Sequence, residues 1–184
     1  HAFAIADYLT SALDCPIFPV HRLDRGTSGV MLFAKSTRWA RVLQEALADE
    51  QAEKAYQALC HNTWTLGCKS FNMHLERNHK KMHVVDRGLL AVTSVRPIQV
   101  NTAYSHLDVV ISTGRMHQIR VCLSHLGFPL LGDRLYGADD FKSPWQSPWP
   151  FLHASKLSIV IDGQKYVFTA PLTLEQEKCL KIIF

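Results

Sequence analysis

The chain has 184 residues, of which 47% are hydrophobic, and its 20 Lys+Arg against 16 Asp+Glu give a formal net charge of +4. These figures exclude a disordered chain, which would combine low hydrophobicity with high net charge, and they predict a core of ordinary size. The modest positive charge favours a polyanionic partner, although it is smaller than that of domains that bind nucleic acid by charge alone.

The cysteine spacing and the lengths of the apolar runs indicate the compartment. None of the five cysteines forms a pair with zinc-ligand or redox-motif spacing, and a disulfide-stabilised domain would be richer in cysteine. No apolar run approaches the roughly 18 residues of a membrane-spanning helix. We therefore expect reduced thiols in a cytoplasmic protein that does not span a membrane.

Hydrophobic periodicity predicts two helices in the first fifty residues. The first covers 2–13, and a short extended segment follows at 17–20. A buried strand is expected at 30–34. The second helix begins after a cap at Ser36 or Thr37, and its inward face consists of Trp39, Val42, Leu43, Ala46 and Leu47.

Strands dominate the remainder of the chain. They are expected at 54–60, 69–75, 81–85, 89–100 and 103–111, followed by a helix over 116–126 that ends at Gly127. Segments 157–161 and 166–170 form a hairpin over Asp162-Gly163, and a last helix covers 174–183. In the connection before that hairpin, Trp145 and Trp149 are expected to cover the edge of the core. The order of elements predicts one α+β domain over 1–184, mostly antiparallel, without repeats or a linker.

The segment from His21 to Gly29 is the first candidate site. Asp24 lies between Arg22 and Arg25, whose charges favour its ionised form, and an ionised carboxylate suits a nucleophile or a base. The glycines of this segment let the backbone approach a ligand closely. The alternative is a surface turn in which Asp24 is a salt-bridged cap.

Two further segments carry candidate residues. Over 113–120 a glycine turn leads into a helix whose N-terminus favours a phosphate, with Arg115 before it and Arg120 in its second turn; the alternative is an ordinary basic amphipathic helix. Lys54 and Tyr56 share one face of a strand, where Tyr56 either stacks on a base or packs in the core.

The histidines do not predict a metal site. His74, His79 and His83 fall on expected strands and a turn, without a helical His-Glu-x-x-His pattern or a nearby cysteine pair. Basic residues lie around them, and they form either a solvated face or a rim that contacts RNA: Arg77, Lys80, Lys81 and Arg87.

Taken together, the motifs resemble those of the RluA-type pseudouridine synthases. The stretches 21–29, 54–56 and 113–120 occur in the order and spacing of that family, and the resemblance covers the chain from about residue 2 to 170. Further matches are 127–133 with Tyr136-Gly137, and Leu152-His153-Ala154.

The resemblance implies an RNA isomerase. Members of this family break the bond between uracil N1 and the ribose, turn the base, and form a carbon–carbon bond, without metal or cofactor. The implied partner is ribosomal or transfer RNA, no obligate protein partner is implied, and we expect a monomer. The implied fold is a mixed, largely antiparallel bent sheet flanked by helices.

The same resemblance implies roles for seven residues. Asp24 matches the essential aspartate, as nucleophile or base, and Arg120 matches the arginine that pairs with it. Tyr56 matches a tyrosine that stacks on the base and transfers a proton, and Ile119 a residue that packs against the ring. Arg22 matches the arginine that fills the space left by the flipped uridine. The resemblance implies that Arg115 and His117 contact the RNA backbone or support the catalytic residues.

The chain departs from the family pattern at three places. It starts at a helix that in the family follows a strand carrying Asn-Lys-Pro, so the N-terminal strand is expected to be missing. Met116 replaces a common Thr, and Cys122 a common His. Two other hypotheses are a non-catalytic RNA-binding module that keeps the fold, and a metal-dependent phosphodiesterase, which the lack of clustered carboxylates disfavours.

Overall fold

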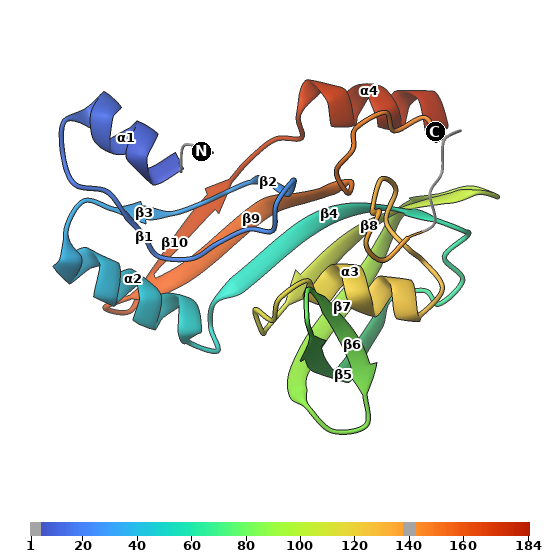
Figure 1. Cartoon of the computed structure of the whole chain (residues 1–184), viewed down its shortest axis with the longest axis horizontal. Helices are drawn as coiled ribbons and strands as arrows, with labels where there is room; N and C mark the ends of the chain where they lie inside the picture. Colours follow the sequence, from blue (N-terminus) through green and yellow to red (C-terminus); the bar gives the residue numbers. More distant parts are fainter. Residues whose placement is uncertain (1–4, 138–142) are drawn as a thin grey trace.

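An eight-stranded, largely antiparallel sheet forms the centre of the molecule in the computed structural model, which describes residues 5–137 and 143–184 (Figure 1). Its strand order is β10-β9-β4-β8-β7-β5-β6, and β2 lies parallel beside β9. The strands are β2 (Ser28–Gly29), β4 (Glu53–His61), β5 (Lys69–Asn78), β6 (Lys81–Val85), β7 (Leu89–Val100), β8 (Tyr104–Ile111), β9 (Leu152–Ile161) and β10 (Gln164–Thr169). A separate two-stranded pair consists of β1 (Phe18–Pro19) and β3 (Phe33–Ala34).

Helices lie on both sides of this sheet. Figure 1 shows α4 (Leu174–Ile183) on one side, and α2 (Thr37–Ala48) and α3 (Gln118–His125) on the other. The remaining helix is α1 (Ile5–Leu13). The predicted α+β fold is therefore confirmed. Within residues 5–137 and 143–184, no helix combines the length and the apolar character needed to cross a membrane.

Strand β4 explains why the sheet is covered on both sides. Ala58, Leu59 and Cys60 in its middle are fully buried, although successive side chains of a strand point to opposite faces. Ala58 and Cys60 pack with Ile119 and Leu123 of α3, whereas Leu59 packs with Cys179 of α4. Because β4 is apolar on both faces, it needs a cover on each side.

Most predicted elements are present, and the turns follow their sequence signals. The segments expected at 54–60, 81–85, 89–100, 103–111 and 174–183 match β4, β6, β7, β8 and α4 closely. Ser36 caps α2 by accepting a hydrogen bond from the Trp39 N–H. The hairpin of β9 and β10 turns at Asp162 and Gly163, which have φ of 51° and 77°, as a two-residue turn requires.

Three local expectations are wrong in part. The strand expected at 30–34 forms only at Phe33–Ala34, because the Val30 N–H donates to the Ala154 carbonyl and the Leu32 N–H to His21 Nε2. Helix α3 starts at Gln118 instead of 116, because His117 adopts a left-handed φ of 53°.

The third concerns the helix faces. Trp39 is 52% exposed, since α2 packs through Ala46 and Leu47 near its C-terminal end. The helix expected over 2–13 is present as α1, although no described residue of α1 is buried. Residues 1–4, including Ala2 of its expected inward face, lie outside the described residues.

A buried histidine makes the stability of this fold depend on pH. His106 of β8 is 5% exposed, and its Nε2 lies 2.9 Å from Gln57 Oε1. Its Nδ1 is buried and has no hydrogen-bond partner in the described part of the chain. Burial lowers the pKa of His106 to about 4, against a smaller opposing effect of Asp108. A proton on Nδ1 would therefore destabilise the folded state.

We expect the His106→Gln variant to lose much of the acid sensitivity of folding. The unfolded chain protonates His106 near the ordinary histidine pKa of 6.5, but the folded protein resists protonation down to about 4. The free energy of unfolding is therefore unaffected above pH 6.5 and falls as the pH drops from 6.5 towards 4. The loss amounts to about 2 kcal/mol between pH 7 and pH 5. Urea unfolding at pH 7 and pH 5 measures this loss, and the exposed His83→Gln is the control. If His106→Gln loses as much free energy of unfolding between the two pH values as the wild type, the prediction is wrong.

Candidate active site

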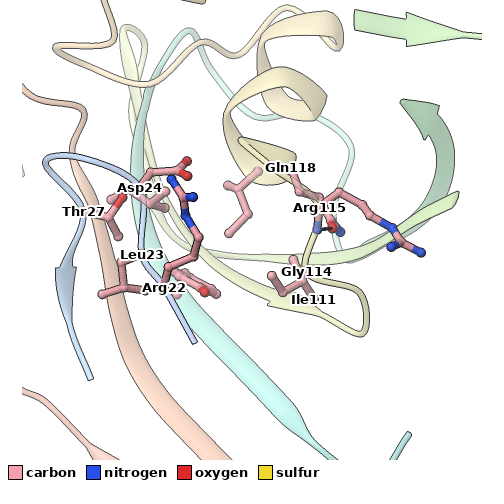
Figure 2. Close-up of a pocket in the computed structure, with 11 residues that line it drawn as sticks. Arg22, Leu23, Asp24, Thr27, Ile111, Gly114, Arg115 and Gln118 are labelled. Atoms are coloured by element: carbon pink, nitrogen blue, oxygen red, sulfur yellow. Dashed lines mark hydrogen bonds between the residues drawn. The ribbon is translucent and has the colours of Figure 1, made fainter. Parts of the chain in front are cut away.

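A cavity of about 80 Å³, termed here the site cavity, brings together residues from three distant segments (Figure 2). Five of the seven predicted site residues line it: Arg22, Asp24, Tyr56, Arg115 and Ile119. They come from the loop between β1 and β2, from β4, and from the start of α3. Figure 2 shows the Asp24 carboxylate pointing towards the side of the cavity where α3 begins.

The loop that carries Asp24 owes its shape to close backbone contacts. The Thr27 N–H donates to the Asp24 carbonyl over 2.9 Å, which closes a turn in which Gly26 has a φ of 87°. Gly29 has a φ of 114°, and a Cβ there would lie 2.2 Å from the Ala154 carbonyl oxygen. Only glycine fits this position, so the sequence of the loop allows β2 to pair with β9.

A buried histidine attaches the same loop to β9. Ser28 Oγ lies 2.8 Å from His153 Nδ1, and His153 Nε2 lies 3.1 Å from the Ala170 carbonyl. Because a carbonyl only accepts, the contact with Ala170 assigns a proton to Nε2, which leaves Nδ1 as the nitrogen that faces the Ser28 hydroxyl. His153 thus holds the end of the loop in place.

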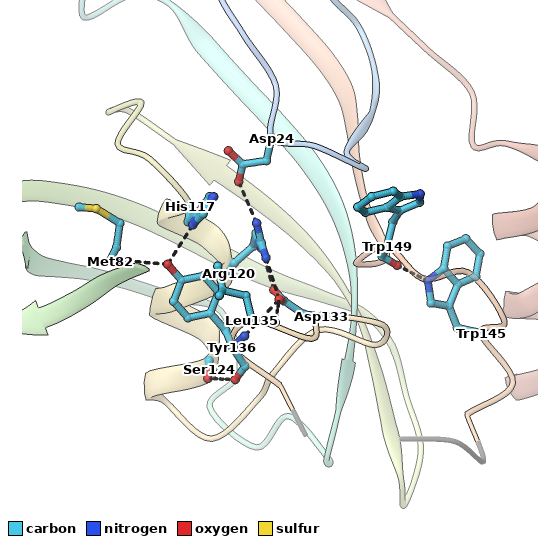
Figure 3. A network of polar contacts seen from close by, with 10 residues as sticks. All are labelled: Asp24, Met82, His117, Arg120, Ser124, Asp133, Leu135, Tyr136, Trp145 and Trp149. Atoms are coloured by element: carbon cyan, nitrogen blue, oxygen red, sulfur yellow. Dashed lines mark hydrogen bonds and ion pairs between the residues drawn. The ribbon is translucent and has the colours of Figure 1, made fainter. Parts of the chain in front are cut away.

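The Arg120 guanidinium lies between two carboxylates (Figure 3). Its Nε and Nη2 donate to Asp133 Oδ2 and Oδ1 over 2.7 and 2.8 Å. Its Nη1 lies 3.7 Å from Asp24 Oδ2, which is an ion pair without a close hydrogen bond. The expected pair of Arg120 and Asp24 is therefore present, but the shorter, bidentate contact is to Asp133.

Asp133 is a fixed anchor for this arginine. Its side chain is fully buried and also accepts from the backbone N–H groups of Leu135 and Tyr136. Burial lowers the pKa of Arg120, but the hydrogen bond and charge of Asp133, together with the charge of Asp24, outweigh this and raise it overall. Arg120 stays charged, and its free Nη1 edge faces Asp24.

Tyr56 presents a neutral phenol to the site cavity. Burial, supported by the negative charge of Asp24, raises the pKa of Tyr56 to about 12. Its hydroxyl therefore keeps its proton at neutral pH. With Ile119, Tyr56 gives the cavity an aromatic and an aliphatic wall, which suits a planar base.

His117 and Arg115 take positions at the edge of the site. His117 does not line the site cavity; its Nδ1 lies 2.9 Å from the Tyr136 hydroxyl, to which the Met82 N–H donates. Burial lowers the pKa of His117, although Asp24 opposes this. The Arg115 side chain extends away from Asp24 in Figure 2, and its Nε donates to the Leu90 carbonyl.

The structure also bears on the sequence analysis of Lys54 and of a metal site. Lys54 does not join Tyr56 there, because its ammonium donates to the Leu47 carbonyl at the end of α2. In the described part of the chain, no group of three or more His, Cys, Asp or Glu residues is arranged to hold a metal ion.

Sequence reasoning missed the role of Asp133 and Tyr136. Both lie in a stretch that the family resemblance includes, but neither was assigned to the site. Tyr136 lies under the Arg120 guanidinium, 5.2 Å from it, and Asp133 holds the other edge of that group. The Gly132-Asp133 pair followed by Tyr136-Gly137 was the available signal.

Comparisons with known proteins identify the family. The family described as RNA pseudouridylate synthase matches residues 2–125. The chain belongs to this family. The resemblance to RluA-type synthases is thereby confirmed, since relatives include the ribosomal large subunit pseudouridine synthase D of Pseudomonas aeruginosa, 38% identical over 64% of this chain and 38% of that protein.

Other relatives and structures agree. A Chloroflexus aurantiacus protein named an uncharacterized RNA pseudouridine synthase is 37% identical over 88% of this chain and 52% of the relative. The chain thus spans about half, or less, of the length of these two relatives. The structure of Human RNA Pseudouridylate Synthase Domain Containing 1 matches with a TM-score of 0.82 at 22% identity, over 96% of this chain and 78% of that one, which shows the same fold.

We expect Asp133→Asn to lower kcat for RNA at least tenfold with a smaller change in KM. Removing the charge that anchors Arg120 leaves a buried cation less well paired, which also costs about 3–5 kcal/mol of stability. Tritium release from labelled RNA and urea unfolding measure the two effects. The control is Asp108→Asn, which breaks the partly exposed 2.7 Å pair with Arg96 and costs less than about 1 kcal/mol. A folded Asp133→Asn enzyme with normal kcat would contradict the anchoring role.

Proposed function

We propose that this chain isomerises uridine to pseudouridine in RNA, with Asp24 as the catalytic carboxylate. The observation that carries the proposal is the position of Asp24 in the site cavity, with Tyr56 beside it and the free edge of Arg120 3.7 Å away. The 80 Å³ of the site cavity is several times the roughly 10–15 Å³ that one water needs, so the cavity admits a group larger than a water.

The reaction is balanced within the substrate. The bond from uracil N1 to ribose C1′ breaks, a bond from uracil C5 to C1′ forms, and the hydrogen of C5 leaves as a proton that N1 regains in exchange with solvent. Asp24 serves either as the nucleophile or as the base that removes a proton, and both roles need its ionised form. Arg120 places a positive charge beside this carboxylate, with Nη1 3.7 Å from Asp24 Oδ2, and Asp133 keeps Arg120 oriented.

The base has to leave the RNA stack before it can reach Asp24. Extrusion costs roughly a few kcal/mol. Arg22 is exposed and lines the mouth of the site cavity, so its side chain is placed to enter the space that the uridine vacates. Tyr56 and Ile119 then hold the extruded ring, with the Tyr56 phenol, whose pKa is about 12, as a proton donor.

The proposed target is ribosomal RNA, with transfer RNA as the alternative. Relatives named for the large ribosomal subunit support the first. The basic residues of the β5–β6 hairpin and its exit (Arg77, Lys80, Lys81 and Arg87) are proposed to contact the RNA backbone.

We propose a monomeric catalytic domain in the cytoplasm. The five cysteines are free thiols, which suits a reducing compartment.

The decisive experiment is the Asp24→Asn variant. The amide keeps the size of the side chain but cannot attack or accept a proton, so we expect conversion to fall at least a thousandfold while RNA affinity changes little. Tritium release from RNA labelled at uridine C5 measures conversion, and filter binding measures affinity. The control is Asp162→Asn, in the β9–β10 turn. If wild-type protein binds RNA tightly but never turns over, the chain is a binding module and the proposal fails.

A further inference from the structure

The phenol of Tyr136 joins the arginine of the site to the outer edge of the sheet. Its hydroxyl accepts from the Met82 N–H over 2.7 Å, and the centre of its ring lies 5.2 Å from Arg120 Cζ (Figure 3). Met82 belongs to β6, the last strand in the order of the described sheet. One side chain therefore contacts both an edge strand and the guanidinium that faces Asp24.

The Met82 N–H is available for this contact because β6 is an edge strand in the described sheet. β6 pairs with β5, where Arg77 lies opposite Met82. In an antiparallel pair, the N–H groups along a strand point alternately towards the partner strand and away from it. The Met82 N–H points away from β5, and Met82 is only 2% exposed, so the phenol takes the place of water as its acceptor. Tyr136 thus holds the backbone of the β5–β6 hairpin at its open edge.

The ring of Tyr136 restricts a motion of Arg120 that Asp133 leaves open. Asp133 accepts from Nε and Nη2 of Arg120 over 2.7 and 2.8 Å, which fixes one edge of the guanidinium. The guanidinium plane can still tilt about the line that joins the two acceptor oxygens, and such a tilt moves Nη1 relative to Asp24. An aromatic ring against one face opposes this tilt, since cation–π attraction favours a fixed placement of the group over the ring.

Tyr136 is itself held from several sides. The Ser124 hydroxyl of α3 donates to the Tyr136 carbonyl over 2.6 Å, and the Tyr136 N–H donates to Asp133 Oδ1 over 3.2 Å. His117 Nδ1 lies 2.9 Å from the phenol oxygen, and its ring meets the Tyr136 ring edge-on at 81°. The Tyr136 side chain also packs against the buried cluster that contains Met82. A side chain with so many fixed partners transmits a displacement of β6 to whatever lies on its face.

We propose that Tyr136 is a positioning residue through which β6 holds the Arg120 guanidinium in line with Asp24. The ring sets the tilt of the guanidinium, and the hydroxyl ties the ring to the Met82 N–H. The inference rests on the proposed function, in which the basic residues of the β5–β6 hairpin contact RNA. The hairpin that meets the RNA backbone is thereby joined to the arginine beside the catalytic carboxylate.

The first test is the kinetics of Tyr136→Phe on RNA labelled at uridine C5. The variant keeps the ring but loses both contacts of the hydroxyl, so we expect kcat to fall about tenfold while KM changes less than about twofold. Tyr166→Phe, which removes an exposed hydroxyl that contacts Gln164 on β10, is the matched control and keeps the wild-type kcat. A folded Tyr136→Phe enzyme with wild-type kcat overturns the proposal.

A double-mutant cycle with Arg120→Lys separates positioning from a general structural effect. Lysine keeps the charge but has no guanidinium plane for a ring to align. In the Arg120→Lys background we therefore expect Tyr136→Phe to lower kcat by less than about twofold, measured in single turnovers. The same tenfold loss in both backgrounds would mean that Tyr136 does not act through Arg120, and the proposal would be wrong.

Amide hydrogen exchange tests the link to the hairpin without any turnover. Loss of the acceptor in Tyr136→Phe should speed exchange of the Met82 N–H at least about tenfold, whereas Tyr166→Phe leaves it unchanged. Unchanged protection of the Met82 N–H in Tyr136→Phe overturns the proposed link to β6. Failure of the proposed function is distinct, because it appears as the absence of tritium release from the wild-type protein.

Discussion

The site depends on one buried cation held between two carboxylates. Arg120 donates from Nε and Nη2 to the fully buried Asp133, and its remaining nitrogen, Nη1, faces Asp24. A buried guanidinium without these partners would be strongly destabilising. Because Asp133 satisfies one edge completely, the other edge is both oriented and free to act on a group that enters the cavity. Tyr136 adds its ring to the same arrangement.

The segment that contains Asp133 joins two functions that lie apart in the sequence. Gly132 has a φ of 75°, and a Cβ there would lie 2.4 Å from the Trp149 carbonyl oxygen. The backbone that positions Asp133 thus touches Trp149, which lies against the Arg25 guanidinium and packs on Gly26. The contact between Gly132 and Trp149 therefore links two parts of the site. On one side Asp133 orients the arginine that faces Asp24, and on the other Trp149 packs on the loop that carries Asp24.

Local chemistry made much of the fold and part of the site predictable. The cap at Ser36, the Asp162-Gly163 turn and the alternating strands each act over a few residues, so pattern alone located them. Asp24 and Tyr56 were candidate residues from the pattern of their own segments and Ile119 from the family resemblance, and the structure brings all three to one cavity. Their chemical roles remain the proposals made above.

What the sequence determined by itself is the order of elements, the family and a set of candidate residues, because these depend on local spacing and composition. The tertiary structure alone decided the partners. In the folded chain Arg120 makes its bidentate contact with Asp133, and Lys54 donates to the Leu47 carbonyl instead of lining the cavity. The Trp149 ring lies against the Arg25 guanidinium. Such contacts join segments far apart in the chain, and their distances follow from how β4, α3 and the 143–151 segment pack around the sheet, which no local pattern encodes.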